Sequence, residues 1–367
     1  MNQARVTRRR PTMHDVADEA GVSLKTVSRV VNREGGVRPD LVDRVKTAID
    51  DLGYQRHDSA RQLRTGGGAS RTIGFVQLDV ANPFFSAIYR GIEDVSTAHG
   101  YQVIAGSSDG DSDQQDAVLR ALISRRVDGI IIVPWGDRLG LLTAEMERNT
   151  AVVFLDLEPP AGIAGDLVRS DHRGGARTIT RHLIEHGHER IAFIGDHPSI
   201  FSAEERFQGF AEAMSEAGLV VDRRWVNREL GDPTRTRESV AHVFENYPDD
   251  SAPTAIVAGQ NFITIVAVQT LHDLDLHHRV ALVGFDDVEL SDVVEPGITV
   301  MPQSPRELGQ RAAHLLLRRL GGYDGPPELE IPDDRIIVRG SGEIAPPEAG
   351  AARVQRAAPS SSRSRRA

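Results

Sequence analysis

Apolar residues follow a helical spacing at the start of the chain and a strand-like pattern over most of the rest. Up to about residue 52 they recur every three or four positions, which is the spacing of amphipathic helices. From about Arg71 to Gly340, short continuous apolar runs alternate with amphipathic stretches. Continuous runs of this kind are typical of parallel strands buried on both faces. We therefore expect a small all-α region followed by a larger α/β region.

Seven apolar runs in the larger region predict strands. They are residues 72–76, 102–105, 129–133, 152–155, 191–194, 255–258 and 281–285. The helices predicted between them include residues 85–99, 114–125, 174–186 and 204–217. Repeated β-α units indicate an α/β sheet. Because the alternation restarts in the second half, we expect two subdomains, each with its own sheet.

The first region predicts three short helices. Thr12 and Asp15 have the spacing of a capping box at the start of the first helix. Gly21 can end this helix in the left-handed conformation, and Ser23 can cap the next one. The turn between them is as short as a helix-turn-helix requires. A third helix is predicted over residues 39–52, with Pro39 in its first turn.

The second helix leaves polar side chains free for a partner. Val16, Ala17 and Ala20 share one face of the first helix, and Val27 and Val30 can pack against that face. The side chains then left exposed near the end that would enter a DNA major groove are Leu24, Lys25, Ser28 and Arg29. The alternative is an ordinary helical hairpin with a solvated polar face.

The segment after the third helix has the features of a hinge that DNA orders. Residues 57–64 are too few to form a stable helix alone, so DNA or a second copy would have to order them. Residues 65–70 have the composition of a linker.

Three runs of residues carry a family resemblance. The first run spans residues 15–32 and contains Asp15-Val-Ala, Gly21-Val-Ser and Thr26-Val-Ser-Arg-Val-Val-Asn32. The second is Leu52-Gly-Tyr54, and the third is Ala60-Arg-Gln-Leu63. In them the chain resembles the lactose-repressor (LacI/GalR) family of bacterial transcription regulators, and the resemblance extends over residues 12–341. It implies that two hinges pair over the operator and push Leu63 into the minor groove, with Ala60 and His57 beside it. The family usually has Pro-Asn where this chain has Arg56-His57, so the resemblance does not fix the hinge's phosphate contacts.

The resemblance also implies the domain organisation. The core is expected to be similar to periplasmic sugar-binding proteins, with two α/β subdomains joined by crossover strands near residues 167, 298 and 333 and a ligand cleft between them. The expected parts are a basic arm (1–11), a DNA-binding headpiece (12–56), hinge and linker (57–70), core (71–340) and disordered tail (341–367). Within the core, the first subdomain takes about 71–167 and 299–332, and the second takes 168–298 and 333–340.

Residues that follow predicted strands are the candidates for a ligand site, because ligands of α/β sheets bind at the carboxyl ends of strands. Position and family resemblance together select Asn82, Phe84, Phe85, Asp156, Arg206, Gln260, Asp286 and Gln303. Each has a structural alternative: the phenylalanines as core, the aspartates as turn or cap residues, the arginine as a surface ion pair. Gln260-Asn261 replaces the family's usual Asn-Asp, and Pro302 replaces a commonly basic residue, so the ligand is not fixed by the resemblance.

Charge is distributed unevenly along the chain. Residues 1–65 hold 13 Lys and Arg against 9 Asp and Glu, whereas the whole chain holds 43 against 53 and has a net charge of −10. The first part is therefore attracted to nucleic acid phosphates, and the acidic remainder is not. With no cysteine, a disulfide framework and a thiolate metal site are excluded. No apolar run has the length of a signal peptide core or a membrane span, which favours a cytoplasmic protein.

Catalysis is the rival class of function. The run His182-Leu-Ile-Glu185-His186 fits the inverted zinc-protease pattern. However, no third ligand is evident, and histidines at a helix C-terminus are also favoured by the helix dipole. Phosphate loops, nucleophile elbows and dinucleotide-binding glycine motifs do not occur in the sequence. We expect no catalytic residue, no metal and no cofactor.

The sequence as a whole predicts a regulator that binds double-stranded DNA. We expect a repressor that binds a palindromic operator as a homodimer and is controlled by a small ligand, a sugar or sugar derivative. The tail lacks a leucine heptad, so a dimer is the simplest assembly. A sugar-binding transport or receptor protein with the same core is the alternative, and the DNA-binding headpiece and the lack of a signal peptide disfavour it.

Overall fold

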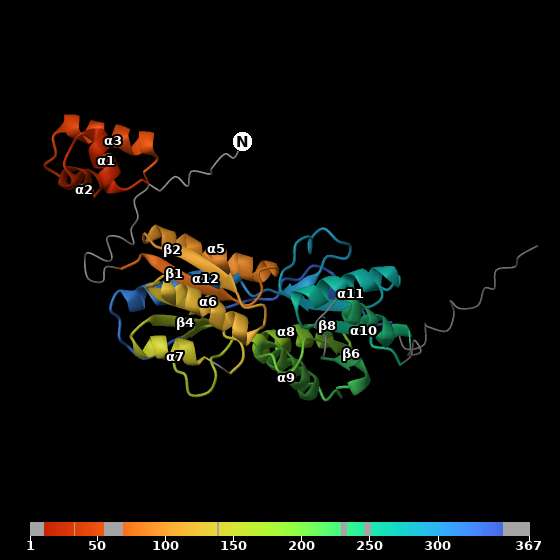
Figure 1. Cartoon of the computed structure of the whole chain (residues 1–367). Coiled ribbons are helices and arrows are strands. Elements are labelled where there is room, and N and C mark those ends of the chain that lie inside the picture. The colour runs from red at the N-terminus through yellow and green to blue at the C-terminus, as the bar shows by residue number, and fades with distance from the viewer. Residues whose placement is uncertain are drawn as a thin grey trace, which may run out of the picture. The chain divides into compact units, whose positions relative to one another are not determined.

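The computed structural model describes residues 11–32, 34–54, 69–137, 139–228, 233–245 and 251–347. Its chain divides into two compact units, residues 1–70 and 71–367, which Figure 1 colours from red to blue along the sequence. The predicted hinge residues His57, Ala60 and Leu63 lie outside the described residues. The same is true of the arm up to residue 10 and of the tail beyond residue 347.

The headpiece contains the three predicted helices, α1 (Met13–Ala20), α2 (Leu24–Val31) and α3 (Pro39–Leu52). The capping box is present, since Thr12 caps α1 and Asp15 bonds back to it. Gly21 ends α1 with a φ of 59°, in the left-handed region that glycine adopts without strain. Apolar side chains from all three helices form one small core: Val16, Ala17, Ala20, Val27, Val45 and Ala48.

The first subdomain of the larger unit is a six-stranded parallel sheet in the order β11-β5-β4-β3-β1-β2. Its strands are β1 (Thr72–Gln77), β2 (Gln102–Ser107), β3 (Gly129–Ile132), β4 (Ala151–Leu155), β5 (Asp166–Val168) and β11 (Leu329–Glu330). Two separate clusters of buried side chains cover its two faces. The helices are α5 (Pro83–Ala98) and α12 (Pro305–Leu320) on one face, and α6 (Ser112–Ser124) and α7 (Gly140–Glu147) on the other.

The second subdomain is a five-stranded parallel sheet in the order β10-β9-β8-β6-β7. Its strands are β6 (Ile191–Ile194), β7 (Val226–Asn227), β8 (Ala255–Ala258), β9 (Ala281–Phe285) and β10 (Thr299–Met301). One face carries α8 (His172–Glu185) and α9 (Phe201–Glu216), and the other carries α10 (Pro233–Glu245) and α11 (Asn261–Asp273). Two short 3-10 helices, η1 (Arg223–Trp225) and η2 (Ser341–Glu343), complete it. Figure 1 shows the two subdomains side by side.

All seven predicted strands are present, and the fold class is confirmed. The additional strands β5, β7, β10 and β11 are only two or three residues long. The chain passes between the subdomains three times: after β5, after β10 and after β11. Because residues 299–301 pair with β9, the second crossing follows residue 301, and the assignment of residues 299–301 to the first subdomain was wrong.

The expectation of disorder from residue 341 onward was wrong for residues 341–347. This segment begins with η2 and is held against the second subdomain. The Ser341 hydroxyl donates to the carbonyl of Leu282 (2.6 Å), and Ile344 accepts a hydrogen bond from the ring of His188 (2.8 Å). Within the described residues, no helix is both long and apolar enough to span a membrane.

Candidate DNA interface and ligand cleft

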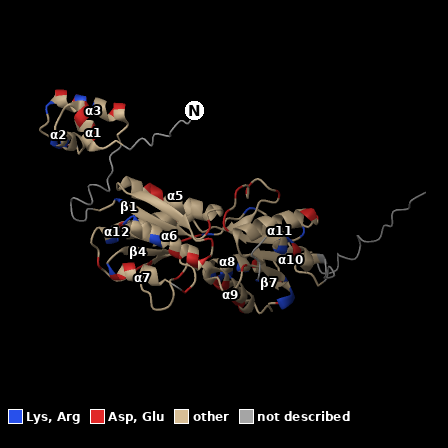
Figure 2. Cartoon of the chain, viewed as in Figure 1, with Lys and Arg blue, Asp and Glu red and all other residues tan. Residues whose placement is uncertain are grey.

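The exposed face of α2 is the candidate DNA interface. Val27 is fully buried against the other headpiece helices, which fixes the rotation of α2. Lys25 is exposed, and Leu24 and Ser28 are half-buried. The helix carries two basic residues and no acidic one, whereas α1 and α3 carry the acidic residues that Figure 2 shows in red. Of the three helices, α2 is therefore the one with a net positive charge.

Arg29 is less free than the sequence suggested. Its guanidinium donates to the carbonyl of Gly35, in the loop that leads to α3. The side chain is half-buried and holds this loop against the end of α2. Of the four predicted major-groove residues, Leu24, Lys25 and Ser28 thus share an open face, and Arg29 lies at its edge.

The candidate ligand cleft lies where strands of both sheets end. Asp156 follows β4 of the first subdomain, and Asp286 follows β9 of the second; both have a left-handed backbone, with φ of 64° and 66°. Between them lies Arg206 of α9, which is only 5% exposed. Its guanidinium donates to the carbonyl of Gly259 (2.6 Å) and lies 4.3 Å from the centre of the Phe285 ring. The sequence alternative of a surface ion pair for Arg206 is thereby excluded.

A buried histidine joins the two subdomains at this point. His172, at the start of α8, has its Nδ1 3.2 Å from Nη2 of Arg206. A guanidinium can only donate, so Nδ1 accepts this bond, and a neutral ring then carries its proton on Nε2. That Nε2 lies 3.7 Å from Oδ1 of Asp156. Burial and the neighbouring charge of Arg206 hold the pKa of His172 well below its usual value, so the ring is neutral at pH 7.

Carboxyl groups in the cleft have raised pKa values. Burial raises the pKa of Asp156 to about 6, with Arg206 opposing the shift and Asp286 adding to it. Asp196, just after β6, has its pKa raised to about 6 by burial, again opposed by Arg206. Burial also raises the pKa of Asp286, against Arg206 and the amide of Gln303 that donates to it. One guanidinium thus offsets two buried carboxyl groups, Asp156 and Asp286, and the half-buried Asp196.

Several buried polar atoms in the cleft have no hydrogen-bond partner within the described chain. They are Oδ1 of Asp156, Nε2 of His172, Nε of Arg206 and Oε1 of Gln303. An unsatisfied buried polar group costs about 1–3 kcal/mol. Both donors and acceptors are represented, and a hydroxyl group can pair with either kind of atom.

Amide side chains form a second link between the subdomains. Asn82 caps α5 by accepting from the backbone N–H of Phe84 (3.0 Å), and the same oxygen accepts from Nδ2 of Asn261 in the second subdomain (2.8 Å). The Gln260 oxygen caps α11 through the N–H groups of Phe262 and Ile263. Asn261, which the sequence prediction did not select, is therefore the amide that reaches across.

The predicted phenylalanines are packed inside the first subdomain. Phe84 and Phe85 are 8% and 4% exposed, belong to its main apolar cluster and meet edge to face with centres 5.2 Å apart. The aromatic ring next to the buried histidine is Phe201, whose centre lies 6.5 Å from that of His172.

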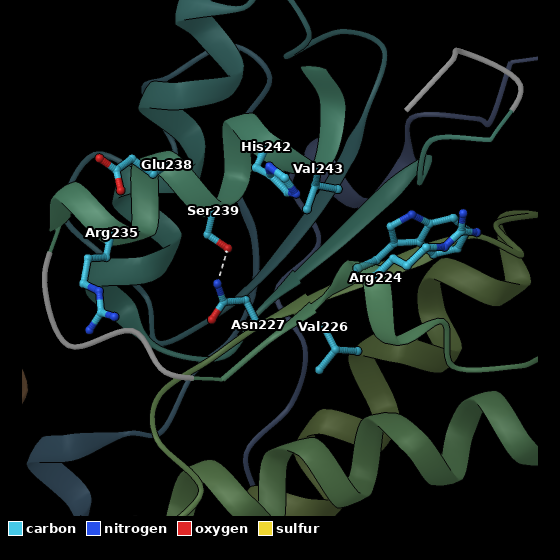
Figure 3. A pocket seen from close by; sticks show the side chains of 9 residues that line it. Arg224, Val226, Asn227, Arg235, Glu238, Ser239, His242 and Val243 are labelled. Atoms are coloured by element: carbon cyan, nitrogen blue, oxygen red, sulfur yellow. Dashed lines mark hydrogen bonds between the residues drawn. The ribbon is translucent and has the colours of Figure 1, made fainter. Parts of the chain in front are cut away.

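The structure also has two cavities, of which only the first touches these groups. One of about 420 Å³ lies beside the crossing segments and reaches Gln303 and Phe285. Another, of about 360 Å³, lies between η1, β7 and α10, where Asn227 donates to Ser239 (2.7 Å), as Figure 3 shows. No predicted ligand residue lines the second cavity.

Comparison with known proteins gives a consistent identification. Residues 12–57 match the model of bacterial regulatory proteins of the lacI family, and residues 180–342 match the periplasmic binding protein-like domain. The HTH-type transcriptional repressor PurR of Aliivibrio salmonicida is 30% identical over 84% of this chain and 92% of its own length. The chain belongs to the lacI family. PurR of Photobacterium profundum is also 30% identical, and its match extends over 90% of this lacI-family chain and 98% of the length of that PurR.

Solved structures agree with this family assignment. The transcriptional regulator CelR, solved in complex with cellobiose, is 27% identical and superposes with a TM-score of 0.66 over 90% of this chain and 100% of its own. The lac repressor dimer bound to operator and the anti-inducer ONPF has a TM-score of 0.77 over 92% of this chain and all of its own. At 24% identity, that likeness shows the fold. The resemblance stated from the sequence and the two-subdomain core are thus confirmed.

Proposed function

We propose that this lacI-family chain is a cytoplasmic transcriptional repressor that binds a palindromic operator as a homodimer and releases or binds it in response to a small neutral polyhydroxylated ligand, a sugar or sugar derivative. The match extends over 92% and 98% of the length of the two relatives named as repressors. Residues 12–57 separately match the model of lacI-family regulatory proteins. A sugar-binding transport or receptor protein would have no DNA-binding segment, so the comparisons do not favour that alternative.

DNA recognition is assigned to the open face of α2. Leu24, Lys25 and Ser28 would contact base edges and phosphates, and Arg29 would do so after leaving Gly35. The hinge contacts of His57, Ala60 and Leu63 belong to the same proposal. A bound dimer would obstruct polymerase, which makes repression the simplest outcome.

Selection from a random duplex library tests this assignment. The purified chain is incubated with the library at moderate salt, with and without a panel of sugars, and the retained DNA is sequenced. We expect one palindrome to be enriched, and we expect Lys25→Ala to reduce retention. Glu19→Ala, on an exposed position of α1, is the matched control. The absence of enrichment under every condition would contradict sequence-specific binding.

The unsatisfied polar atoms between the two subdomains are the observation that carries the ligand proposal. Three carboxyl groups face one guanidinium, which disfavours an anionic ligand. Carboxylates accept paired hydrogen bonds from neighbouring hydroxyl groups, and Arg206 can donate to a ring or hydroxyl oxygen. A ligand bound by both sheets would change how the subdomains close. By linkage, a ligand that weakens operator binding is itself bound more weakly by the operator complex.

The Arg206→Ala variant tests the ligand site. We expect it to retain operator binding and to lose the response to any sugar that shifts wild-type affinity. Arg173→Ala is the matched control, because Arg173 is an exposed arginine paired with Glu212 across α8 and α9. A response of normal size in Arg206→Ala would refute the cleft assignment without affecting the DNA-binding assignment.

A further inference from the structure

The end of α8 carries a cluster of potential metal ligands that the proposed function does not use. His182 and His186 are four residues apart on this helix, and their ring centres are 4.4 Å apart. Glu343 of η2 lies beside them, with its Oε1 in contact with Nε2 of His182. One ligand atom from each of the three residues lies within 4.8 Å of the other two. Glu343 is thus a candidate third ligand, which the sequence did not reveal.

Glu343 is held in place by the fold rather than by the histidines alone. Its Oε2 accepts from the backbone N–H of Gly340 (2.6 Å) and from the hydroxyl of Thr299 (3.0 Å). These bonds fix the carboxylate and leave Oε1 directed at His182. Carboxylates that bind metals are commonly hydrogen-bonded to neighbouring groups in this way.

The ring of His186 is also oriented. Its Nδ1 lies 2.7 Å from the backbone carbonyl of His182, and a carbonyl can only accept, so Nδ1 carries the proton. In the neutral ring, Nε2 then keeps its lone pair. Metal-binding histidines usually donate their second ring N–H to a carbonyl or carboxylate, which fixes the tautomer in this manner.

The geometry points to a site for a divalent late transition metal ion, which we propose is bound by His182, His186 and Glu343. Two neutral imidazoles and one carboxylate form a set that Zn²⁺ accepts, with a fourth position left for water. Imidazole ligands favour such ions over Mg²⁺ and Ca²⁺. The site is separate from the ligand cleft, because His172 and His182 are about 15 Å apart along α8 at the rise of an α-helix.

A metal at this position would fasten the segment 341–347 to α8. Glu343 and His182 are 161 residues apart in the sequence, and Glu343 also contacts Thr299 of β10. β10 leads directly into the second crossing between the subdomains. The metal would therefore stabilise the second subdomain at the place where the chain returns to it.

Zn²⁺ titration of the full chain tests the proposal. Chelator-treated wild type is titrated calorimetrically with Zn²⁺ and followed by absorption with Co²⁺. The variants are His186→Gln, at an exposed position, and Glu343→Gln. The control is His278→Gln, which alters the other group of neighbouring histidine rings in the described chain. Thermal melting without metal checks that every variant folds.

We expect wild type and His278→Gln to bind one Zn²⁺ per chain, and both site variants to bind it about tenfold or more weakly. Amide exchange of residues 341–345 should slow with Zn²⁺ in wild type and not in His186→Gln. The proposal is overturned if wild type binds no Zn²⁺, if the site variants bind as tightly as wild type, or if only His278→Gln loses binding. In the first case His182 and Glu343 form a hydrogen-bonded pair and nothing more.

Discussion

The headpiece and the ligand cleft differ in the kind of side chain that they bury. Among the described residues of the headpiece, every buried side chain is apolar, and the starts of α1 and α2 are capped by residues next to them in sequence. In the cleft, Asp156, His172 and Arg206 are buried together, and each has an atom without a partner. The buried part of the headpiece thus needs no outside partner, whereas the polar atoms between the two subdomains lack hydrogen bonds that the proposed ligand would supply.

This difference matches two separate tasks. A DNA-reading element must present one fixed face, and local capping with a small apolar core provides it. A responsive cleft must gain free energy when a ligand enters, and unsatisfied groups at the junction of two subdomains provide that gain. Each of the following predictions concerns a substitution either in the cleft or in the headpiece.

Removal of Arg206 should have the largest effect. Arg206→Ala leaves Asp156, Asp196 and Asp286 without their neighbouring positive charge, and loss of one partner from a buried charge cluster costs about 3–5 kcal/mol. Denaturant unfolding of the full chain at pH 8 would measure this loss in the core transition. The loss should shrink at pH 5, where the carboxyl groups can take up protons. Arg173→Ala should change stability by less than about 1 kcal/mol, because its ion pair is exposed; an equal loss in both variants would contradict the prediction.

Neutralising Asp156 should change how stability depends on pH. Its pKa is raised to about 6 in the folded chain, so the folded state favours the protonated carboxyl. The stabilisation from this proton is complete below the unfolded pKa of about 4 and is lost as the pH rises through 6. Asp156→Asn should therefore match wild type near pH 4 and be more stable by about 2–3 kcal/mol at pH 8.

Unfolding free energies at pH 4, 5, 6 and 8 check this prediction. Asp137→Asn, at an exposed position, is the control and should run parallel to wild type. An Asp156→Asn curve that also runs parallel to wild type would show that the cleft does not penalise this charge.

Local sequence signals predicted the headpiece almost completely. Thr12, Ser23 and Gly21 each form capping hydrogen bonds with residues no more than four positions away. The ends of these helices could therefore be predicted from the local sequence. In the core, the predicted helices begin two or three residues late, because Asn82 and Asp171 act as caps that the apolar pattern does not show. The short strands β5, β7, β10 and β11 carry too few residues to establish a pattern.

The cleft could be predicted only in part. Asp156 and Asp286 were selected because they follow long apolar strands. Asp196 follows β6 in the same way and was missed. His172 has no local signal, since its role depends on Asp156 and Arg206 meeting it across the fold. Glu343 was assigned to a disordered tail because hydrogen bonds to Gly340 and Thr299, rather than an apolar pattern, hold it in place.

The smallest predicted effect is that of a substitution in the headpiece, and it tests whether the headpiece is stable without the core. Thr12→Ala removes the side chain that accepts from the N–H of Asp15 (3.4 Å) and donates to its carboxylate (2.7 Å), and loss of an N-cap costs about 1 kcal/mol. Amide exchange in the full chain should show faster opening of α1, while β1 and β6 keep wild-type rates. Glu19→Ala, exposed on the same helix, should leave α1 unchanged. If Thr12→Ala also accelerated exchange in the core strands, the headpiece would not be complete by itself, and its stability would depend on the core.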